Sequence, residues 1–182
     1  MGRVLDVVRM HRHRRRPQLV ERAGLGREAQ HAVAPVDQGS FLRQEVEQAA
    51  EAVNARWAHG DWTPVVVDAR DDFPRSVAGL ARYDVLLVNP IKDGLNLVAK
   101  EGPLLNRRDG VVLLSPEAGA YDELAEAVLA IHPYDIEQGA RALHDALSMS
   151  ETERASRAQR VCELAAVHTP QTWLRELLNH AR

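Results

Sequence analysis

Short apolar runs, separated by helix-forming stretches, are the feature that most restricts the fold of this chain. The clearest are Val85–Val88 and Val111–Leu114; Pro64–Val67 is a third run, and Val128–Ile131 is a weaker fourth. None alternates apolar with polar residues, which is typical of strands buried on both faces of a parallel sheet. The runs therefore predict a doubly wound parallel α/β sheet with helices on both of its faces.

The stretches between the runs carry the period of amphipathic helices. Between residues 40 and 57, apolar residues recur at steps of three and four, with Ser40 as the expected N-cap. Capping-box pairs are expected at Asp135 with Gln138 and at Ser150 with Glu153. The other expected helices cover residues 71–81, 96–105, a short stretch after Gly119, 135–147, 150–167 and a last segment from Thr169.

Three parts of the chain follow from these patterns. Residues 1–39 have weak periodicity and contain the basic run His11–Pro17, which we interpret as a solvated arm because nothing aromatic or apolar accompanies the charges. Residues 40–168 form the predicted Rossmann-like domain, and residues 169–182 a C-terminal helix.

Composition excludes several classes of function. The net charge of -3 argues against a general nucleic-acid binder, and no apolar stretch approaches the roughly 20 residues that span a bilayer. The single cysteine, Cys162, offers neither an internal disulfide nor a metal cluster. We expect a cytoplasmic protein with no metal and no membrane or nucleic-acid partner.

The candidate site follows Val85–Val88, where a polar loop leads into a helix. In open α/β sheets, ligands bind beyond the carboxyl ends of the strands. We expect Gly94 to adopt a backbone conformation that other residues avoid, and Asn96 to cap the helix. The amides of Leu97 and Val98 would then face the crevice, where a helix N-terminus suits a diphosphate.

Two acidic residues accompany this helix start. Asp93 lies on the loop, where it could accept hydrogen bonds from sugar hydroxyls, and Glu101 shares a helix face with Leu97. A carboxylate at Glu101 could accept two hydrogen bonds from a ribose. The residues alone leave a plainer alternative open, in which Asp93 is solvated and Glu101 only favours the helix dipole.

Residues 85–101, VLLVNPIKDGLNLVAKE, resemble the signature of the trehalose-6-phosphate synthase family, a strand followed by a D-G-x-N-L-V-x-x-E loop. The resemblance implies the C-terminal, donor-binding half of a retaining glycosyltransferase with two Rossmann-like domains (GT-B). Such an enzyme transfers glucose from a nucleotide diphosphate glucose to glucose 6-phosphate, with no metal and no other cofactor. The similarity extends over residues 41–178, through DWTP at 61–64, DFPRS at 72–76, SPEAGA at 115–120 and HPYD at 132–135.

The resemblance also implies roles for individual residues. Asp93 would be the catalytic-site acid that binds glucose hydroxyls, Glu101 would bind the ribose, and Arg9 stands where the family has an arginine that clamps the diphosphate. Catalysis would consist mostly of positioning and charge stabilisation. The residues that would hold the sugar and the diphosphate are Gly94, Asn96, Leu97 and Val98.

The chain departs from the family pattern in ways that leave alternatives. It has no counterpart of the acceptor-binding domain, so we expect it to be inactive alone, or to be completed by another chain or by self-association. His132 replaces an asparagine, which we interpret as a harmless surface change. The alternatives are a pseudo-glycosyltransferase of the same fold and a non-catalytic module that binds nucleotide sugars or regulates a partner.

Overall fold

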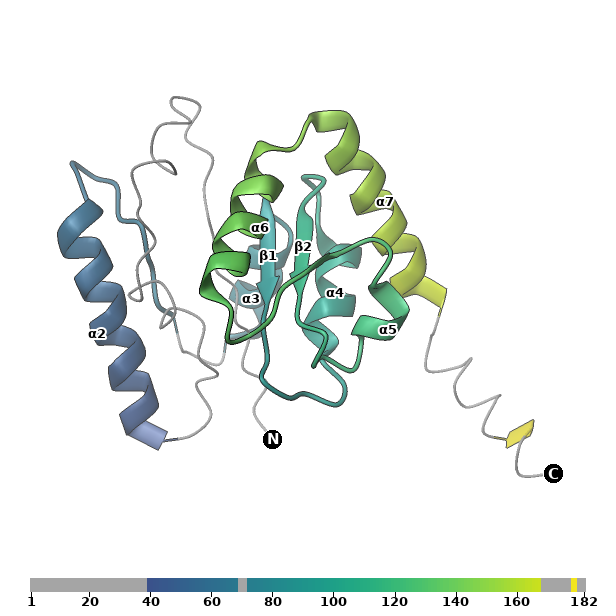
Figure 1. The fold of residues 1–182 in the computed structure, drawn as a ribbon, viewed down its shortest axis with the longest axis horizontal. Helices are drawn as coiled ribbons and strands as arrows, with labels where there is room; N and C mark the ends of the chain where they lie inside the picture. Colours follow the sequence, from purple (N-terminus) through teal and green to yellow (C-terminus); the bar gives the residue numbers. More distant parts are fainter. Residues whose placement is uncertain (1–38, 69–71, 168–177, 180–182) are drawn as a thin grey trace.

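A parallel sheet of three strands forms the centre of the computed structural model, which describes residues 39–68, 72–167 and 178–179 (Figure 1). The strands β1 (Val85–Val88), β2 (Val111–Leu114) and β3 (Leu129–Ala130) are hydrogen-bonded in the order β1-β2-β3. Three of the four apolar runs are therefore strands, as predicted. Arg9, the basic run and most of the expected C-terminal helix lie outside the described residues.

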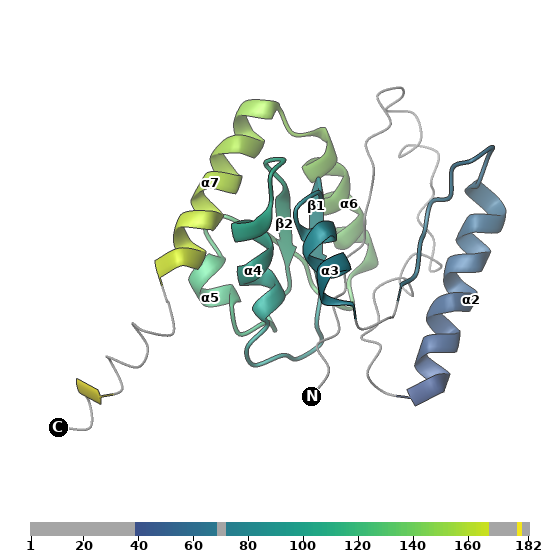
Figure 2. The same cartoon turned by 180° about the vertical axis from the view of Figure 1, so that it is seen from behind.

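Helices cover both faces of this sheet. Figures 1 and 2 show α6 on one face and α3 and α4 on the other, with α2 set to one side of the sheet. Helix α7 packs on the same face as α4, and α5 lies against α7. The bounds are α2 (Gly39–Trp57), α3 (Phe73–Leu80), α4 (Leu97–Leu105), α5 (Tyr121–Leu124), α6 (Ile136–Ser148) and α7 (Glu151–Val167).

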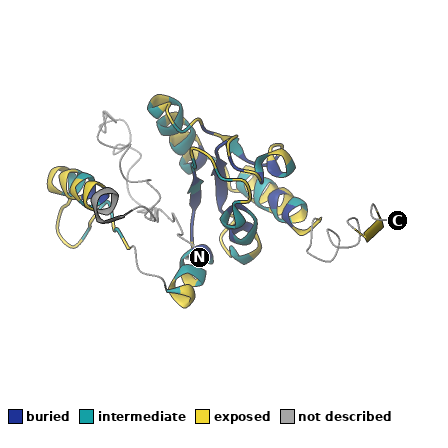
Figure 3. Ribbon diagram, turned by 90° about the horizontal axis from the view of Figure 1, so that it is seen from below, coloured by how far each residue is buried: buried dark blue, intermediate teal, exposed yellow. Residues whose placement is uncertain are grey.

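The strands lack alternation because each of their faces meets a different helix layer. Leu86 and Val88 pack toward the core shared with α4 and α7, whereas Val85 and Leu113 belong to the core beneath α6. Figure 3 shows the strands buried between helices whose outer sides are exposed. A strand enclosed in this way needs apolar residues at every position, which explains the uninterrupted runs in the sequence.

Side-chain caps fix most of the helix starts that the sequence predicted. The carboxylate of Asp135 accepts from the Gln138 amide (2.8 Å), and the Ser150 hydroxyl accepts from the Glu153 amide (3.2 Å). The reciprocal half of the first capping box is wrong, because the Gln138 side chain accepts instead from the His132 amide (2.6 Å). Helix α2 begins at Gly39, so Ser40 lies within its first turn and is not the predicted N-cap.

The remaining apolar run, Pro64–Val67, is not a strand, and this prediction was wrong. Val66 keeps 72% of its surface exposed. The backbone of Val65 is satisfied by a side chain, since the Asn54 amide accepts from its N–H and donates to its carbonyl, both at 2.9 Å. An apolar run becomes a strand only where a neighbouring strand supplies hydrogen-bond partners, and here one asparagine of α2 supplies them.

None of the helices in the described part of the chain combines the length and the apolar character that crossing a bilayer requires.

Asn106, at the end of α4, ties together the loops at the amino ends of the strands. Its side-chain oxygen accepts from the amides of Arg108 and Gly110, both at 2.9 Å, and its side-chain nitrogen donates to the carbonyl of Tyr83 (2.9 Å). These bonds connect the residues before β1 to the turn before β2. Asn106 therefore sets how α4 returns the chain to the sheet.

Replacing Asn106 with alanine should destabilise the protein by about 2–4 kcal/mol, because two amides and a carbonyl lose a shared partner. The matched control is Gln159→Ala, which removes an exposed amide whose nitrogen donates only to Glu163 (2.9 Å), and which should cost less than about 0.5 kcal/mol. Urea unfolding of both variants measures the difference. Equal losses in the two variants would refute the role given to Asn106.

Candidate functional site

The loop that follows β1 lies at the carboxyl edge of the sheet and leads directly into α4 (Figure 1). Gly94 and Leu95 in this loop are exposed, and Asp93 is half-buried. The turn is therefore open to solvent and not sealed beneath other elements. It occupies the edge at which ligands bind in open α/β sheets.

The carboxylate of Asp93 organises this turn. Its Oδ1 accepts from the amides of Leu95 and Asn96, both at 3.2 Å, and its Oδ2 accepts from the side-chain nitrogen of Asn96 (2.9 Å). An ionised carboxylate has about four acceptor positions. Three hydrogen bonds therefore leave it capacity for one further donor.

Asn96 is the residue that turns the chain into α4. It adopts the left-handed conformation (φ 41°, ψ 76°), and its Oδ1 accepts from the amide of Ala99 (3.1 Å). The expectation that Gly94 takes the unusual conformation was wrong, since its φ is not in the left-handed region. Asparagine tolerates this region because its short polar side chain bonds locally, as it does here with Asp93.

This cap leaves two helix amides directed out of the start of α4. Leu97 and Val98 are the first two residues of the helix, and amides at these positions have no acceptor within the helix itself. The Asn96 side chain is committed to Ala99, one residue further on. The predicted pair of amides is therefore presented at the mouth of the turn, where the helix dipole adds partial positive charge.

The loop after β2 fixes the position of this turn by backbone hydrogen bonds. The amide of Asp93 donates to the carbonyl of Glu117 (3.1 Å), and the amide of Gly119 donates to the carbonyl of Asp93 (2.7 Å). Gly119 passes so close that a Cβ there would lie 2.0 Å from the carbonyl oxygen of Gly94. Gly119 was not predicted as a site residue, because a single glycine in the loop after β2 does not indicate which backbone it approaches.

Glu101, the second predicted acid, is half-buried on α4 and belongs to the same loop–helix unit as Asp93. Its neighbour Lys100 points to another element: the Lys100 Nζ lies 2.8 Å from both carboxylate oxygens of Glu123 on α5. This ion pair was not predicted from the sequence. It links residues 23 positions apart, which no local spacing reveals.

Together these groups suit a ligand that combines a diphosphate with hydroxyl groups. Free amides and the helix dipole favour the anion, and carboxylates accept hydrogen bonds from hydroxyls. Within residues 39–68, 72–167 and 178–179, no cluster of three histidine, cysteine or acidic side chains is arranged to hold a metal ion.

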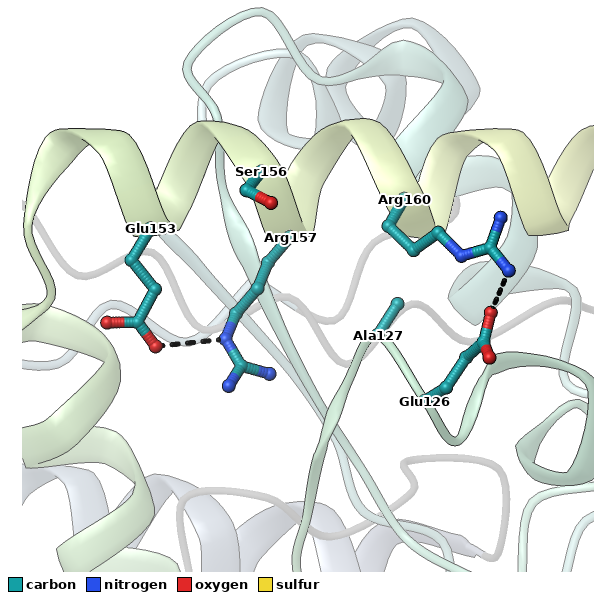
Figure 4. Close-up of a pocket in the computed structure, with 6 residues that line it drawn as sticks. All are labelled: Glu126, Ala127, Glu153, Ser156, Arg157 and Arg160. Carbon is teal, nitrogen blue, oxygen red and sulfur yellow. Dashed lines mark hydrogen bonds and ion pairs between the residues drawn. The ribbon is translucent and has the colours of Figure 1, made fainter.

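A separate hollow lies between α7 and the segment after α5, away from this turn (Figure 4). Its charged groups are paired: Arg157 donates to Glu153 (3.3 Å), and Arg160 forms an ion pair with Glu126. The hydrogen bond that Arg160 donates to Glu126 raises the pKa of Arg160, so this cation is held more firmly protonated. The Arg160–Glu126 pair connects α7 to the α5–β3 segment, whereas the Arg157–Glu153 pair lies within α7. The turn after β1 is therefore the candidate site.

Comparison with known sequences gives one family for most of the chain. The model of glycosyltransferase family 20 matches residues 14–182. A trehalose-6-phosphate synthase of Enterobacter sp. (strain 638) is 36% identical over 158 residues, which cover 80% of this chain and 33% of that protein. The Escherichia coli (strain K12 / DH10B) synthase is 34% identical over 149 residues. The chain thus spans about a third of the length of these curated relatives.

Solved structures share the fold as well as the sequence. An E. coli structure bound with UDP-2-fluoro glucose has a TM-score of 0.71 at 32% identity and covers 77% of this chain and 32% of its own. A UDP-forming synthase from Burkholderia xenovorans in complex with glucose-6-phosphate has a TM-score of 0.70 at 31% identity, with the same coverage of both chains.

Two glycine-to-alanine substitutions should show which glycine of this site is sterically constrained. Gly119→Ala should destabilise the protein by about 1–3 kcal/mol, because its methyl group would collide with the backbone of Gly94. Gly94→Ala should change the free energy of unfolding little, since a Cβ there meets no atom within 4 Å. Chemical denaturation measures both. The close approach of the two loops would be disproved if both variants were equally stable.

Proposed function

This chain belongs to glycosyltransferase family 20, and we propose that it carries the donor site of a retaining glycosyltransferase that uses a nucleotide diphosphate glucose. The observation that supports this most directly is the open turn at the carboxyl edge of the sheet. There Asp93 and Asn96 present the amides of Leu97 and Val98, one helical turn before Glu101. The relatives' structures bound with UDP-2-fluoro glucose and with glucose-6-phosphate support the same class of substrate.

We propose that the diphosphate sits against the amides of Leu97 and Val98. The dipole of α4 and these unpaired donors stabilise negative charge, which grows on the diphosphate as the bond to the sugar breaks. Asn96 then acts by aiming the amides, because its own side chain is engaged with Ala99 and Asp93. Gly94 keeps the approach of the ligand open, because the space that a side chain would fill there is free of protein atoms.

Asp93 is proposed to bind the glucose hydroxyls with the acceptor capacity left after its three hydrogen bonds within the turn. Glu101, on the second turn of α4, is proposed to bind the ribose of the donor. An arginine that clamps the diphosphate would be Arg9, which lies outside the described residues. The reaction then depends on positioning two substrates and stabilising an oxocarbenium-like state, without a protein base.

The acceptor glucose 6-phosphate is proposed to bind to residues other than those of this turn. The proposed donor groups come from one loop and one helix of a chain that spans about a third of the length of the curated relatives. We propose that the acceptor site is provided by a separate chain or by further sequence. This chain would then contribute donor binding, and transfer would require both sites together.

Titration with UDP tests the donor site directly. The wild-type chain should bind UDP, and Glu101→Ala should weaken binding at least about 10-fold, because hydrogen bonds to a charged group contribute about 1.5–3 kcal/mol. Glu151→Ala, an exposed glutamate in the first turn of α7, is the matched control and should leave the Kd unchanged. Equal affinity of the Glu101→Ala variant and the wild type would remove Glu101 from the site.

A second assay tests whether this chain lacks an acceptor site. The chain alone, mixed with UDP-glucose and glucose 6-phosphate, should form no trehalose 6-phosphate, because donor binding without an acceptor site gives no proximity between the substrates. Chromatographic detection of the product measures the outcome. Product formation by the chain alone would show that it contains an acceptor site and would overturn this part of the proposal.

A further inference from the structure

We propose that Lys100 and Glu123 are a positioning pair, which fixes the rotation of the first turn of α4 and thereby aims Glu101 and the helix amides at the donor. This inference rests on the proposed donor site. One juxtaposition carries it. A cation on α4 (the donor helix) is held by a carboxylate whose segment also contacts residues 89–96 (the donor loop).

The pair is close, bidentate and partly shielded from solvent. The Lys100 Nζ lies 2.8 Å from both Glu123 oxygens, and the two side chains keep only 18% and 31% of their surfaces exposed. By contrast, the pair between Glu137 and Arg141 on α6 is 67–84% exposed. Partly buried charges are screened less by water and salt, so the Lys100–Glu123 pair has the stronger orienting effect.

The inner face of α4 packs closely on the core. Ala99 and Gly102 face the core, and a Cβ at Gly102 would lie 2.5 Å from the Leu86 side chain. These small residues let the helix approach the sheet closely, and the partly buried Val98 and Leu105 pack against the same core. Lys100 adds a charged contact outside this core, in the first turn of α4, to Glu123 on α5.

Fixing Lys100 also fixes the residue next to it. Successive residues of an α-helix are separated by about 100° around its axis, so the direction of Glu101 follows from that of Lys100. Leu97, which shares a face with Glu101, turns with it. The ion pair thus adds to the contacts that set where the proposed ribose ligand and the proposed diphosphate amides point.

The carboxylate partner is itself well anchored. Glu123 belongs to the four-residue helix α5, in which the next residue, Leu124, is fully buried in the core against α7. In the segment between β2 and α5, the Gly119 amide donates to the Asp93 carbonyl, and the Glu117 carbonyl accepts from the Asp93 amide. One stretch of chain, residues 117–123, therefore holds both the donor loop and the donor helix.

A charge-swap experiment on the full chain tests the proposal. Glu123→Gln and Lys100→Met should each raise the Kd for UDP about 5- to 10-fold, the scale of coupling between residues in contact. The double variant Lys100→Glu/Glu123→Lys should restore the Kd to within about 2-fold of wild type, because it rebuilds the pair with its charges exchanged. Glu153→Gln, which breaks the ion pair with Arg157 on α7, is the control and should leave the Kd unchanged.

Two outcomes of the titration would overturn the proposal. An unchanged Kd in Glu123→Gln would show that the pair has no effect on the donor site. Failure of the double variant to restore binding, while Lys100→Met alone weakens it, would show that Lys100 acts on the diphosphate by its own charge and not by positioning α4.

Hydrogen exchange provides a readout that does not depend on ligand. In Glu123→Gln, the amides of Lys100 and Glu101 should exchange faster, while those of β2 keep their wild-type rates. Faster exchange with no UDP binding by the wild type would support the positioning pair and refute the donor site. Unchanged exchange would overturn the positioning pair, whatever the chain binds.

Discussion

The geometry of the turn after β1 depends on one carboxylate, that of Asp93. Its hydrogen bonds to the amides of Leu95 and Asn96 and to the Asn96 side chain stabilise a left-handed residue in front of a helix. Such a conformation is costly for residues other than glycine unless local bonds support it. Because Asn96 also caps α4, the direction of the helix amides follows from the same contact. Asp93 is therefore both part of the scaffold and a proposed sugar ligand.

The sequence predicted the elements well wherever the signal was local. The runs at Val85–Val88 and Val111–Leu114 are strands because burial on both faces demands an apolar residue at each position. Pro64–Val67 has the same kind of composition but is not a strand, since strand formation needs a partner that composition cannot specify. Within the site, local spacing predicted the cap at Asn96, but it did not reveal which residue of the turn is left-handed.

The contacts that the sequence could not reveal are those between segments distant along the chain. The backbone hydrogen bonds of Asp93 to Glu117 and Gly119 join two neighbouring loops, and Lys100 reaches Glu123 across 23 residues. A glycine or a glutamate in isolation carries no mark of such a partner. The resemblance of residues 85–101 to a known family indicated where the site lies, and the structure adds how the following segment supports it.

The hydrogen bonds between Asn54 and Val65 have a consequence for how the two positions tolerate change. Both bonds at position 65 come from the main chain, so any residue there except proline, which has no N–H, keeps the groups that form them. At position 54 the bonds come from the side chain, and they require a donor and an acceptor at the same short reach. Aspartate would lose the donor and leucine both groups. Evolutionary drift should therefore be free at the valine and confined at the asparagine, the reverse of what hydrophobicity alone suggests.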